Sequence, residues 1–455
     1  MSTAARLERP LETTRLTEIL SKFVAETPAS RVPPAALQSA RYLILDTIGV
    51  SLAASTRRVG KLISEHVAEE NGKQATASVF GRGALRVSPP LAAMANGTMA
   101  NALDYDGGGH LPTHILPAAL AVAEHEKRSG KDALIAFIVA YEAAHKLTKV
   151  IEGRRSEHKS PTHRGWWHVG LMAPIGAAMA AARLLGFDSH KTATAIGIAT
   201  VGSAGFRRNM GTMAKALHSG NGARFGIEAT SLARRGFTAD PAILESPLGF
   251  VFAVSPADER DTTAVTERLA KPYALEKSPG VKEYPAVTPG HAVIDAARAV
   301  KKQNAFAPED VESVEADYVS FSLLREEAHD DEEAAFCAPF LIAAALVHGK
   351  VGLEEVSEEG VRDPKVRALM KRVKQVPQVA KGKKTVTVHL RDGRKLTAQG
   401  SGSRITDTAV IEAKFAHCAG AVLGDKPADE LKRLILSLDS QPDIQRLMAV
   451  AGGRS

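Results

Sequence analysis

The sequence predicts a mainly α-helical protein with a large helical domain, a smaller α+β domain, and C-terminal helices that return to the first domain. Three observations predict this fold class. Apolar residues recur at helical spacing through residues 13–269 and again through residues 406–451. Between these regions, four prolines break the helical pattern in residues 271–289, and alternating apolar residues typical of strands follow. The expected domains are a helical domain at 1–270, an α+β domain at 271–403 and returning helices at 404–455.

The helical domain is expected to be a bundle around an apolar, alanine-rich helix. Apolar residues between Leu171 and Leu185 follow one another at steps of 4, 3, 4 and 3, so they share one face of a helix that Gly186 ends. The other faces of this helix are largely Ala and Gly, which allows neighbouring helices to approach closely. The same Ala-rich helical pattern occurs in residues 89–103, 117–127, 132–146 and 223–234.

The α+β domain contains a predicted strand pair. Val386, Val388 and Leu390 alternate with polar residues, and the Asp-Gly sequence at 392–393 predicts a tight turn before a return strand at 395–399. A further strand is expected at 312–318, and helices are expected at 291–301, 334–348 and 363–373. The GSGS sequence at 400–403 is the expected hinge through which the chain returns to the helical domain.

Composition excludes several classes of protein. With 455 residues, 44% of them hydrophobic, the chain can bury a large core, which excludes a disordered protein. Cys337 and Cys418 are the only cysteines, so a disulfide scaffold or a multi-thiolate metal site is excluded. The net charge of +7 is dispersed and aromatic residues make up 5%, which favours small anionic partners over nucleic acid.

The distribution of apolar residues also bears on localisation. No stretch reaches the roughly 20 consecutive apolar residues that a membrane helix needs, so no membrane span is expected. Residues 1–12 alternate charges of both signs and lack the apolar core of a secretion signal. We therefore expect a cytoplasmic protein.

The first candidate site lies in the segment NGTMANALDYDGGGHLPTHILP. A helix is expected to end near Asp104 and Asp106, three glycines then allow a sharp turn, and His110 and His114 follow. Carboxylates and imidazoles on such a loop are suited to proton transfer. An equally plausible interpretation of this segment is a glycine loop with two surface histidines that have no catalytic role. A zinc site or a phosphate loop is weaker, because Pro112 opposes a helical pair of ligands and no strand or Lys-Ser/Thr motif is present.

Two further segments combine a cation with imidazoles. In THRGWWHVG, His163, Arg164 and His168 surround the only two tryptophans, an arrangement that can exclude water and bind an anion. The alternative is a pair of anchoring aromatics with solvated neighbours. In GTMAKALHSGNGAR, Lys215 and His218 lie three residues apart and share one face of a helix, which also suits an anion. A solvated helix start is the alternative there.

A fourth candidate lies at the expected domain boundary, where Lys282, Tyr284 and His291 occur close together in the sequence. Ligands often bind in clefts between domains, which favours a binding role for this lysine. A solvated lysine in a linker is an equal alternative.

Six segments together make the chain resemble the MmgE/PrpD family, which includes 2-methylcitrate dehydratases, cis-aconitate decarboxylases and an iminodisuccinate epimerase. They occur in the family's order and span nearly the whole chain. The segments are RYLILDTIGVSLAAS, ANGTMANALDYD, RGWWHVGLMAPIGAAMAAARLLGFD, GTMAKALHSGNGAR, KEYPAVTPGHAVIDAA and VTVHLRDGRKL. The resemblance implies a large helical domain, an α+β lid domain, a homodimer, and a site between the domains that uses no metal, iron-sulfur cluster or other cofactor.

The resemblance also implies roles for individual residues. The residues that match catalytic positions of the family are Asp104, His110, Lys215 and Lys282. The candidate segments themselves supply the residues expected to bind substrate, which are Arg164, His168, His218, Tyr284 and His291. The last of these matches the histidine that precedes the apolar helix of the lid.

The sequence departs from the family pattern at two places. The usual acidic-acidic-Thr loop is replaced by glycines after Asp106, so the roles of the lost carboxylate and hydroxyl are not transferred. Trp167 stands where the family often has a histidine, and His168 comes one residue later.

The resemblance implies a small di- or tricarboxylate as substrate and cleavage of a bond at the carbon beside a carboxylate. We expect Lys215 and Lys282 to stabilise the developing negative charge. His218 or Arg164 would help a lysine to hold substrate carboxylates, while His110, oriented by Asp104, would move the proton. Dehydration of a hydroxy acid such as 2-methylcitrate is the leading expectation, with epimerisation or decarboxylation as alternatives. A non-catalytic polycarboxylate binder is the alternative from another class.

Overall fold

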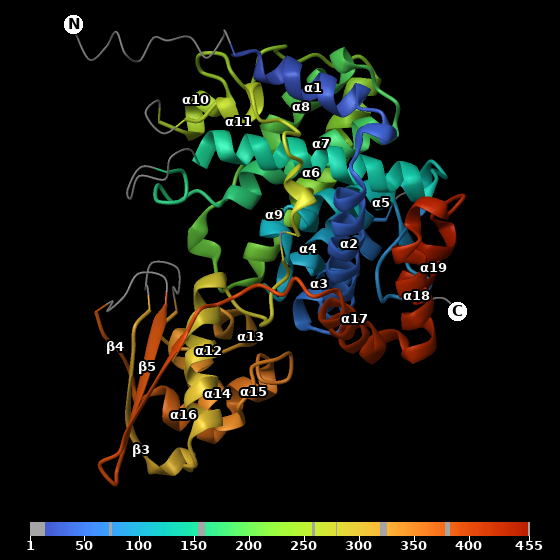
Figure 1. Ribbon diagram of the computed structural model, residues 1–455. Helices are drawn as coiled ribbons and strands as arrows, with labels where there is room; N and C mark the ends of the chain where they lie inside the picture. The colour runs from blue at the N-terminus through green and yellow to red at the C-terminus, as the bar shows by residue number, and fades with distance from the viewer. Residues whose placement is uncertain are drawn as a thin grey trace, which may run out of the picture.

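The computed structural model describes residues 14–71, 75–152, 160–256, 260–278, 280–318, 325–377 and 383–453. Residues 1–12, in which no secretion signal is expected, lie outside the described residues. A large group of helices forms one lobe, and a smaller group of helices and strands lies below it in Figure 1. The predicted fold class, mainly α with a smaller α+β part, is therefore confirmed. Within the described ranges, no helix combines the length and the apolar character that a bilayer span requires.

The large lobe is built around α7, the alanine-rich helix that the sequence predicts. Its helices are α1 (Leu16–Glu26), α2 (Pro34–Ser55), α3 (Arg58–Glu69), α4 (Pro89–Ala102), α5 (Pro112–His125), α6 (Gly130–Glu152), α7 (His168–Leu184), α8 (Ser189–Ala199), α9 (Met213–Arg234), α10 (Phe250–Val254) and α11 (Thr263–Thr266). Nearly all of α7 is buried, because its small side chains let neighbouring helices surround it.

Glycines in α9 bring it close to two other helices. A Cβ atom on Gly220 would lie 2.3 Å from the carbonyl oxygen of Met94 in α4, and one on Gly226 would lie 2.7 Å from that of Pro174 in α7. Only glycine allows both approaches. This packing sets the start of α9, which carries Lys215, against the end of α4, which is followed by Asp104.

The smaller lobe, which we call the α+β unit, contains a four-stranded sheet covered by helices. Its elements are α12 (Thr288–Gln303), β3 (Val311–Ala316), α13 (Asp331–Ala334), α14 (Ala338–His348), α15 (Glu358–Arg362), α16 (Pro364–Met370), β4 (Val373–Gln375), β5 (Lys384–Leu390) and β6 (Lys395–Gly400). The strand order is β4-β3-β5-β6, with β4 parallel to β3 and the other pairs antiparallel. The predicted hairpin is confirmed, with Val386 opposite Ala398. The predicted helix at 363–373 ends earlier, and its last residue opens β4 instead.

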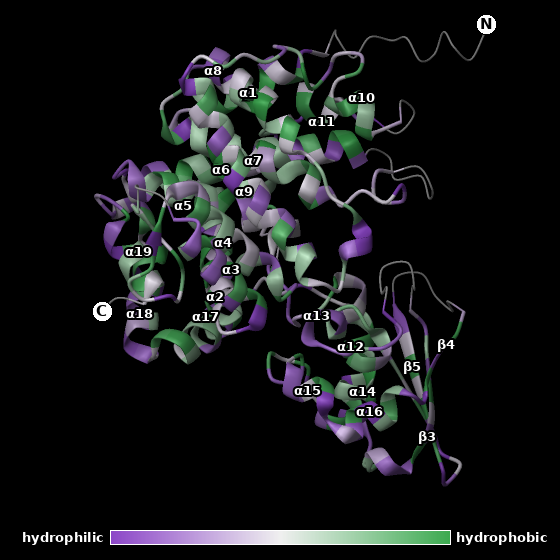
Figure 2. Cartoon of the chain, turned by 180° about the vertical axis from the view of Figure 1, so that it is seen from behind, coloured by the Kyte–Doolittle hydropathy of each residue, from purple (hydrophilic) through white to green (hydrophobic). Residues whose placement is uncertain are grey.

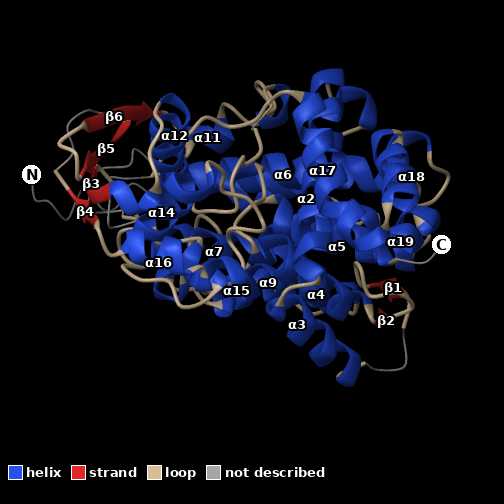
Figure 3. Cartoon of the chain, turned by 90° about the horizontal axis from the view of Figure 1, so that it is seen from below, coloured by secondary structure: helices blue, strands red, loops and turns tan. Residues whose placement is uncertain are grey.

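After the sheet, the chain returns to the large lobe. The returning helices are α17 (Thr408–Leu423), α18 (Asp425–Leu436) and α19 (Gln445–Gly452). On the way back, Ile405 pairs with Val281 in an antiparallel bridge. Helix α17 then packs so closely on α2 that a Cβ atom on Gly49 would lie 2.9 Å from the ring of Phe415. Figure 3 shows the four-stranded sheet at one end of the molecule, and α18, α19 and the short pair β1 (Ala77–Ser78) and β2 (Arg86–Val87) at the other.

Each lobe has its own hydrophobic core, and the two lobes stand apart in Figure 2. Residues of α17 to α19 belong to the core of the large lobe. Trp167, Val169 and Met210 lie in the large lobe but belong to the core of the α+β unit, so the lobes are joined by apolar contacts at this point. The domain boundaries at 270 and 403 stay a prediction.

Candidate active site

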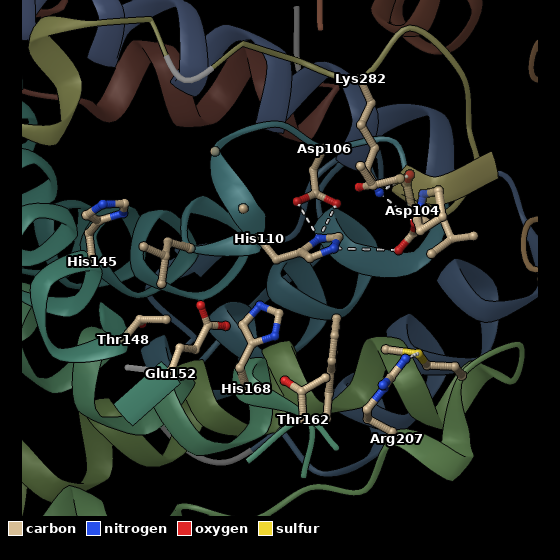
Figure 4. Close-up of a pocket in the computed structure, with 18 of the residues that line it drawn as sticks. Asp104, Asp106, His110, His145, Thr148, Glu152, Thr162, His168, Arg207 and Lys282 are labelled. Atoms are coloured by element: carbon tan, nitrogen blue, oxygen red, sulfur yellow. Dashed lines mark hydrogen bonds and ion pairs between the residues drawn. The ribbon is translucent and has the colours of Figure 1, made fainter. Parts of the chain in front are cut away.

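A cavity of about 630 Å³ opens where the two lobes meet. The large lobe lines it with the loop after α4, with α6, with the turn before α7 and the start of α7, and with the loop between α8 and α9. The other lining residues precede α12, belong to the α+β unit or follow β6. Figure 4 shows Asp106, His110 and Lys282 on one side, with His168 and Arg207 across from them. Segments far apart in the sequence therefore face one space.

Asp104 is held between two lysines at the inner end of the cavity. Its Oδ1 atom lies 2.5 Å from Nζ of Lys215, and its Oδ2 atom lies 2.5 Å from Nζ of Lys282. All three side chains are buried. Lys215 also donates to the carbonyl oxygen of Asn101, and Lys282 to that of Asp104 itself. The two ammonium groups that the sequence analysis singled out thus meet on one carboxylate.

The two lysines decide the ionisation of this carboxylate. Burial alone would raise the pKa of Asp104, but the positive charges of Lys215 and Lys282 outweigh burial and hold the pKa well below its usual value. Burial lowers the pKa of Lys282, and Asp104 opposes that shift. Asp104 is therefore a carboxylate at neutral pH and cannot donate a proton there.

His110 lies beside Asp104 on the glycine-rich turn η4 (Gly108–His110). Gly108 and Gly109 have φ angles of 60° and 65°, a left-handed conformation that suits glycine and turns the chain back toward the cavity. His110 follows with φ 67° and places Nε2 3.8 Å from Oδ1 of Asp104. Its Nδ1–H group donates to Asp106 at 2.8 Å. The carboxylate of Asp106 thus holds the imidazole ring of His110 through Nδ1, and Nε2 of that ring faces Asp104.

The pKa of His110 is lowered by burial, although Asp106 acts in the opposite direction. The pKa of Asp106 is lowered as well, because the effect of His110 and the nearby lysines exceeds that of burial. The negative charges of Asp104 and Asp106 therefore balance the positive charges of Lys215 and Lys282 at this end of the cavity as long as His110 is neutral. In that state, Nε2 of His110 is able to accept a proton.

Aromatic rings form the next part of the wall. Trp167 precedes α7 and its ring lies 5.6 Å from the ring of His110, in an edge arrangement. His168 is the first residue of α7, with its ring 6.3 Å from that of His110. Both residues line the cavity. Trp167, which stands where the family often has a histidine, therefore reaches the site together with His168.

Two arginines that the sequence analysis did not single out also line the cavity. Arg404 follows the GSGS hinge and donates to Oγ1 of Thr288 at 2.7 Å. Arg207 is buried at the opposite wall, and burial lowers the pKa of both guanidinium groups. Because Arg404 directly follows the expected hinge, the sequence could have indicated it as a candidate site residue. The sequence around Arg207 contains no such signal.

Four of the residues expected to bind substrate do not line the cavity. Arg164 is exposed to solvent on the turn before α7. His218 is half-buried, and its Nδ1 atom lies 3.2 Å from the carbonyl oxygen of Lys215. Tyr284 donates to Asp295 of α12 at 2.8 Å, while His291 is buried and contacts the carbonyl oxygen of Ala286. The binding roles of these residues stay predictions. His168 is the member of this set that lines the cavity.

The lining residues suit an anionic ligand and a proton transfer. Arg207 and Arg404 bring positive charge to the lining, and His110 supplies a titratable nitrogen. Carboxylate recognition by guanidinium groups follows from their fixed geometry. Among the described residues, no group of three or more His, Cys, Asp or Glu side chains is arranged to hold a metal ion.

Several curated proteins are similar to this chain over most of its length. The cis-aconitate decarboxylase of Mus musculus is 26% identical over 79% of this chain and 75% of that protein. The cis-aconitate decarboxylase of Homo sapiens is 24% identical over 97% of this chain and 95% of that protein. The cis-aconitate decarboxylase of Aspergillus terreus is 26% identical over 92% of both.

Two sequence profiles match consecutive parts of the chain. That of the MmgE/PrpD N-terminal domain matches residues 18–263, which include most of α1 and all of α2 to α10. That of the MmgE/PrpD C-terminal domain matches residues 284–440, which include the α+β unit and α17. Together they include most of the residues that line the cavity, with Lys282 just before the second match. This chain belongs to the MmgE/PrpD family.

Proposed function

We propose that this protein is a lyase that removes CO2 from cis-aconitate or a closely related unsaturated tricarboxylate. The observation that carries the proposal is the inner end of the cavity, where Asp104 lies between two ammonium groups and beside His110. The names of the similar proteins support decarboxylation in particular. The sequence alone favoured dehydration, with decarboxylation as an alternative.

Substrate binding would depend on the arginines rather than on the lysines. Lys215 and Lys282 already share the charge of Asp104, so they offer a tricarboxylate little net charge. Arg207 and Arg404 carry charge that faces the same space. One unit charge about 4 Å from another contributes roughly 4 kcal/mol at an effective dielectric constant of about 20. An interaction of this size with each arginine would favour the binding of a small polyanion.

The chemical step would be a proton transfer at His110. When CO2 leaves a tricarboxylate trianion, the electron pair of the broken C–C bond moves into the remaining carbon skeleton, and one carbon must then accept a proton. The balance is one trianion and one proton giving one dianion and one CO2. Binding of the trianion raises the pKa of the nearby imidazole, so His110 becomes able to carry this proton. Asp106 holds the ring in place through Nδ1.

A second candidate is dehydration of a hydroxy acid such as 2-methylcitrate. The lowered pKa of His110 favours it, because burial keeps the free imidazole neutral and ready to remove a proton beside a carboxylate. Epimerisation begins with the same removal. These reactions and decarboxylation use the same residues and differ in the products that they form.

Proton NMR in D2O separates these reactions. The purified protein is incubated with cis-aconitate and, separately, with 2-methylcitrate, and the His110→Gln variant is the matched control. We expect the signals of a five-carbon unsaturated diacid with one incorporated deuterium, formed from cis-aconitate by the wild-type protein and far more slowly by the variant. A new alkene from 2-methylcitrate would instead support dehydration, and exchange without conversion would support epimerisation. If either acid binds without chemical change, the result would support a non-catalytic polycarboxylate-binding protein and contradict the proposed reaction.

The remaining expectations from the resemblance also belong to this proposal. We predict a cytoplasmic homodimer that needs no metal or other cofactor. Sedimentation at micromolar concentration tests the dimer, and activity that survives prolonged dialysis against a chelator tests the independence of metal. Activity that is lost on dialysis and restored by one cation would contradict the second prediction.

A further inference from the structure

Lys414 is a buried lysine of α17 that lies outside the cavity but contacts the segments that carry the reacting groups. Its Nζ atom lies 2.6 Å from Oδ1 of Asp46 in α2. It donates to the carbonyl oxygen of Tyr105 at 2.7 Å and to the carbonyl oxygen of Lys282 at 3.0 Å. It also lies 3.6 Å from the centre of the Tyr105 ring. One ammonium group therefore holds three segments that are distant in the sequence.

Asp46 completes the arrangement from the other side. Its Oδ2 atom accepts a hydrogen bond from the backbone N–H of Gly107 at 2.9 Å. Gly107 has no room for a side chain, because a Cβ atom there would lie 2.8 Å from the carbonyl oxygen of Gly280. The loop after α4 and the segment before α12 are thus in direct backbone contact, and Asp46 and Lys414 hold the two sides of this contact.

The backbone atoms that this pair binds belong to the reacting residues or to their immediate neighbours. Tyr105 and Gly107 lie in the chain between Asp104 and His110, and the other backbone group is the carbonyl of Lys282 itself. Lys282 is therefore held at both ends, with its carbonyl oxygen bound by Lys414 and its ammonium group bound by Asp104.

The local backbone needs such support. Asp104 has φ 48°, a left-handed conformation that is unfavourable for a residue other than glycine. In this conformation its carbonyl oxygen and its Oδ2 atom both accept from Lys282. A small shift of either segment would separate these groups, because both contacts depend on the relative position of residues 104 and 282.

We propose that Asp46 and Lys414 are positioning residues that set the distance between Asp104 and Lys282, and so make the returning helix α17 a part of the active-site framework. This inference rests on the proposed function of the same site. It also gives a role to the segment around Asp46, which the sequence analysis singled out and which lies outside the cavity. The alternative is a pair that serves folding alone.

The test compares this pair with another buried lysine–aspartate pair that lies away from the cavity. Lys384 of β5 lies 3.1 Å from Asp317, and both side chains are buried in the α+β unit. The variants are Lys414→Met, Lys414→Arg, the double variant Asp46→Asn/Lys414→Met and the control Lys384→Met. The double variant removes both charges together, so it leaves no unpaired buried charge and keeps the test valid where a single variant fails to fold.

We expect kcat for cis-aconitate to fall about 10- to 100-fold in Lys414→Met and in the double variant. A displacement of about 1 Å at a reacting group has an effect of this size. KM should stay within roughly threefold, since the cavity arginines are untouched. Lys414→Arg should recover part of kcat, because it keeps the charge. Lys384→Met should lower the melting temperature without changing kcat. If the double variant folds and keeps kcat within about twofold of wild type, the pair serves folding alone and the proposal is wrong.

Amide hydrogen exchange keeps this inference separate from the proposed function. In Lys414→Met, peptides that cover residues 103–111 and 280–284 should exchange faster than the same peptides in Lys384→Met. If the wild-type protein turns over none of the polycarboxylates tested, the proposed function fails, but the exchange comparison still decides the positioning role. Equal exchange in the two variants would overturn that role.

Discussion

Two buried carboxylates of this protein bind lysines, yet they stand in different relations to the cavity. Asp104 lines the cavity and contacts two ammonium groups. Asp46 lies behind the cavity, and it binds the ammonium group of Lys414 and a backbone N–H. Both clusters also bind backbone carbonyl oxygens, so what distinguishes them is their position. We propose that the lysine–aspartate cluster that lines the cavity serves chemistry, and that the cluster behind the cavity serves geometry.

The largest effect is expected when the cavity cluster loses one cation. Lys282→Met keeps most of the length of the side chain but leaves Asp104 with Lys215 alone, so the stabilisation of negative charge at the inner end is reduced. We expect kcat/KM for the preferred polycarboxylate to fall about 1000-fold, as for other groups that stabilise charge in a transition state. Steady-state kinetics with Lys384→Met as the control measures this effect. Equal activity in both variants would remove the distinction between the two clusters.

The next effect concerns the proton carrier of the cavity cluster. His110→Gln keeps a hydrogen-bonding side chain toward Asp106 but cannot carry a proton, so we expect kcat to fall about 100- to 1000-fold. Deuterium incorporation from D2O into the product should fall in parallel. His190→Gln, on an exposed helix start, should leave both rates unchanged. A variant at residue 110 with normal deuterium incorporation would show that another group moves the proton.

A smaller effect should separate the arginines that face the cavity from one that does not. Arg404→Gln removes a charge from the lining, so we expect KM to rise about 10- to 100-fold, the usual cost of a lost hydrogen bond to a charged group. Arg164→Gln should change KM little, because Arg164 is exposed and does not line the cavity. Initial rates over a range of substrate concentrations measure both values. A larger effect at Arg164 would restore its predicted role in substrate binding.

The smallest effect is a change of stability with pH at His291, which is buried near Lys282. Burial, with a smaller contribution from Lys282, lowers its pKa to about 3. Between pH 6.5 and this value the unfolded chain binds a proton that the native protein does not, so the free energy of unfolding decreases as the pH falls. Each such histidine contributes about 1.4 kcal/mol per pH unit.

Urea unfolding at pH 7.5 and pH 5.5 measures this dependence. His291→Gln should show a shallower loss of stability between the two pH values than wild type, and His190→Gln should show the same loss as wild type. An unchanged pH dependence in His291→Gln would mean that the pKa of His291 is the same in the native and unfolded protein, which would contradict the lowered pKa.

The sequence predicts the parts of the site that local pattern determines. The glycines after Asp106 indicate a sharp turn, and the structure shows that turn carrying His110 into the cavity. The apolar, alanine-rich helix and the hairpin around Asp392 are confirmed for the same reason. Local periodicity and turn chemistry act over a few residues, so they are readable without the fold.

Residues that depend on distant packing could not be predicted in this way. In the sequence Lys414 is indistinguishable from a solvated lysine of a helix. It is buried because α17 packs on α2, where Asp46 lies, and on the segments of Tyr105 and Lys282. Arg207 reaches the cavity because of the loop between α8 and α9, whereas Arg164, beside the tryptophans, points to solvent. Which arginine faces a cavity is decided by tertiary structure and not by neighbours in the sequence.

The most direct test of the central claim is the rate of CO2 release from cis-aconitate by the wild-type protein and by Asp104→Asn. This variant keeps the shape of residue 104 but removes the carboxylate that joins Lys215 and Lys282. We predict steady CO2 release by the wild-type protein and a decrease of about 1000-fold in the variant, with an unchanged circular dichroism spectrum. Equal rates in the two proteins would contradict a reacting centre built on this carboxylate.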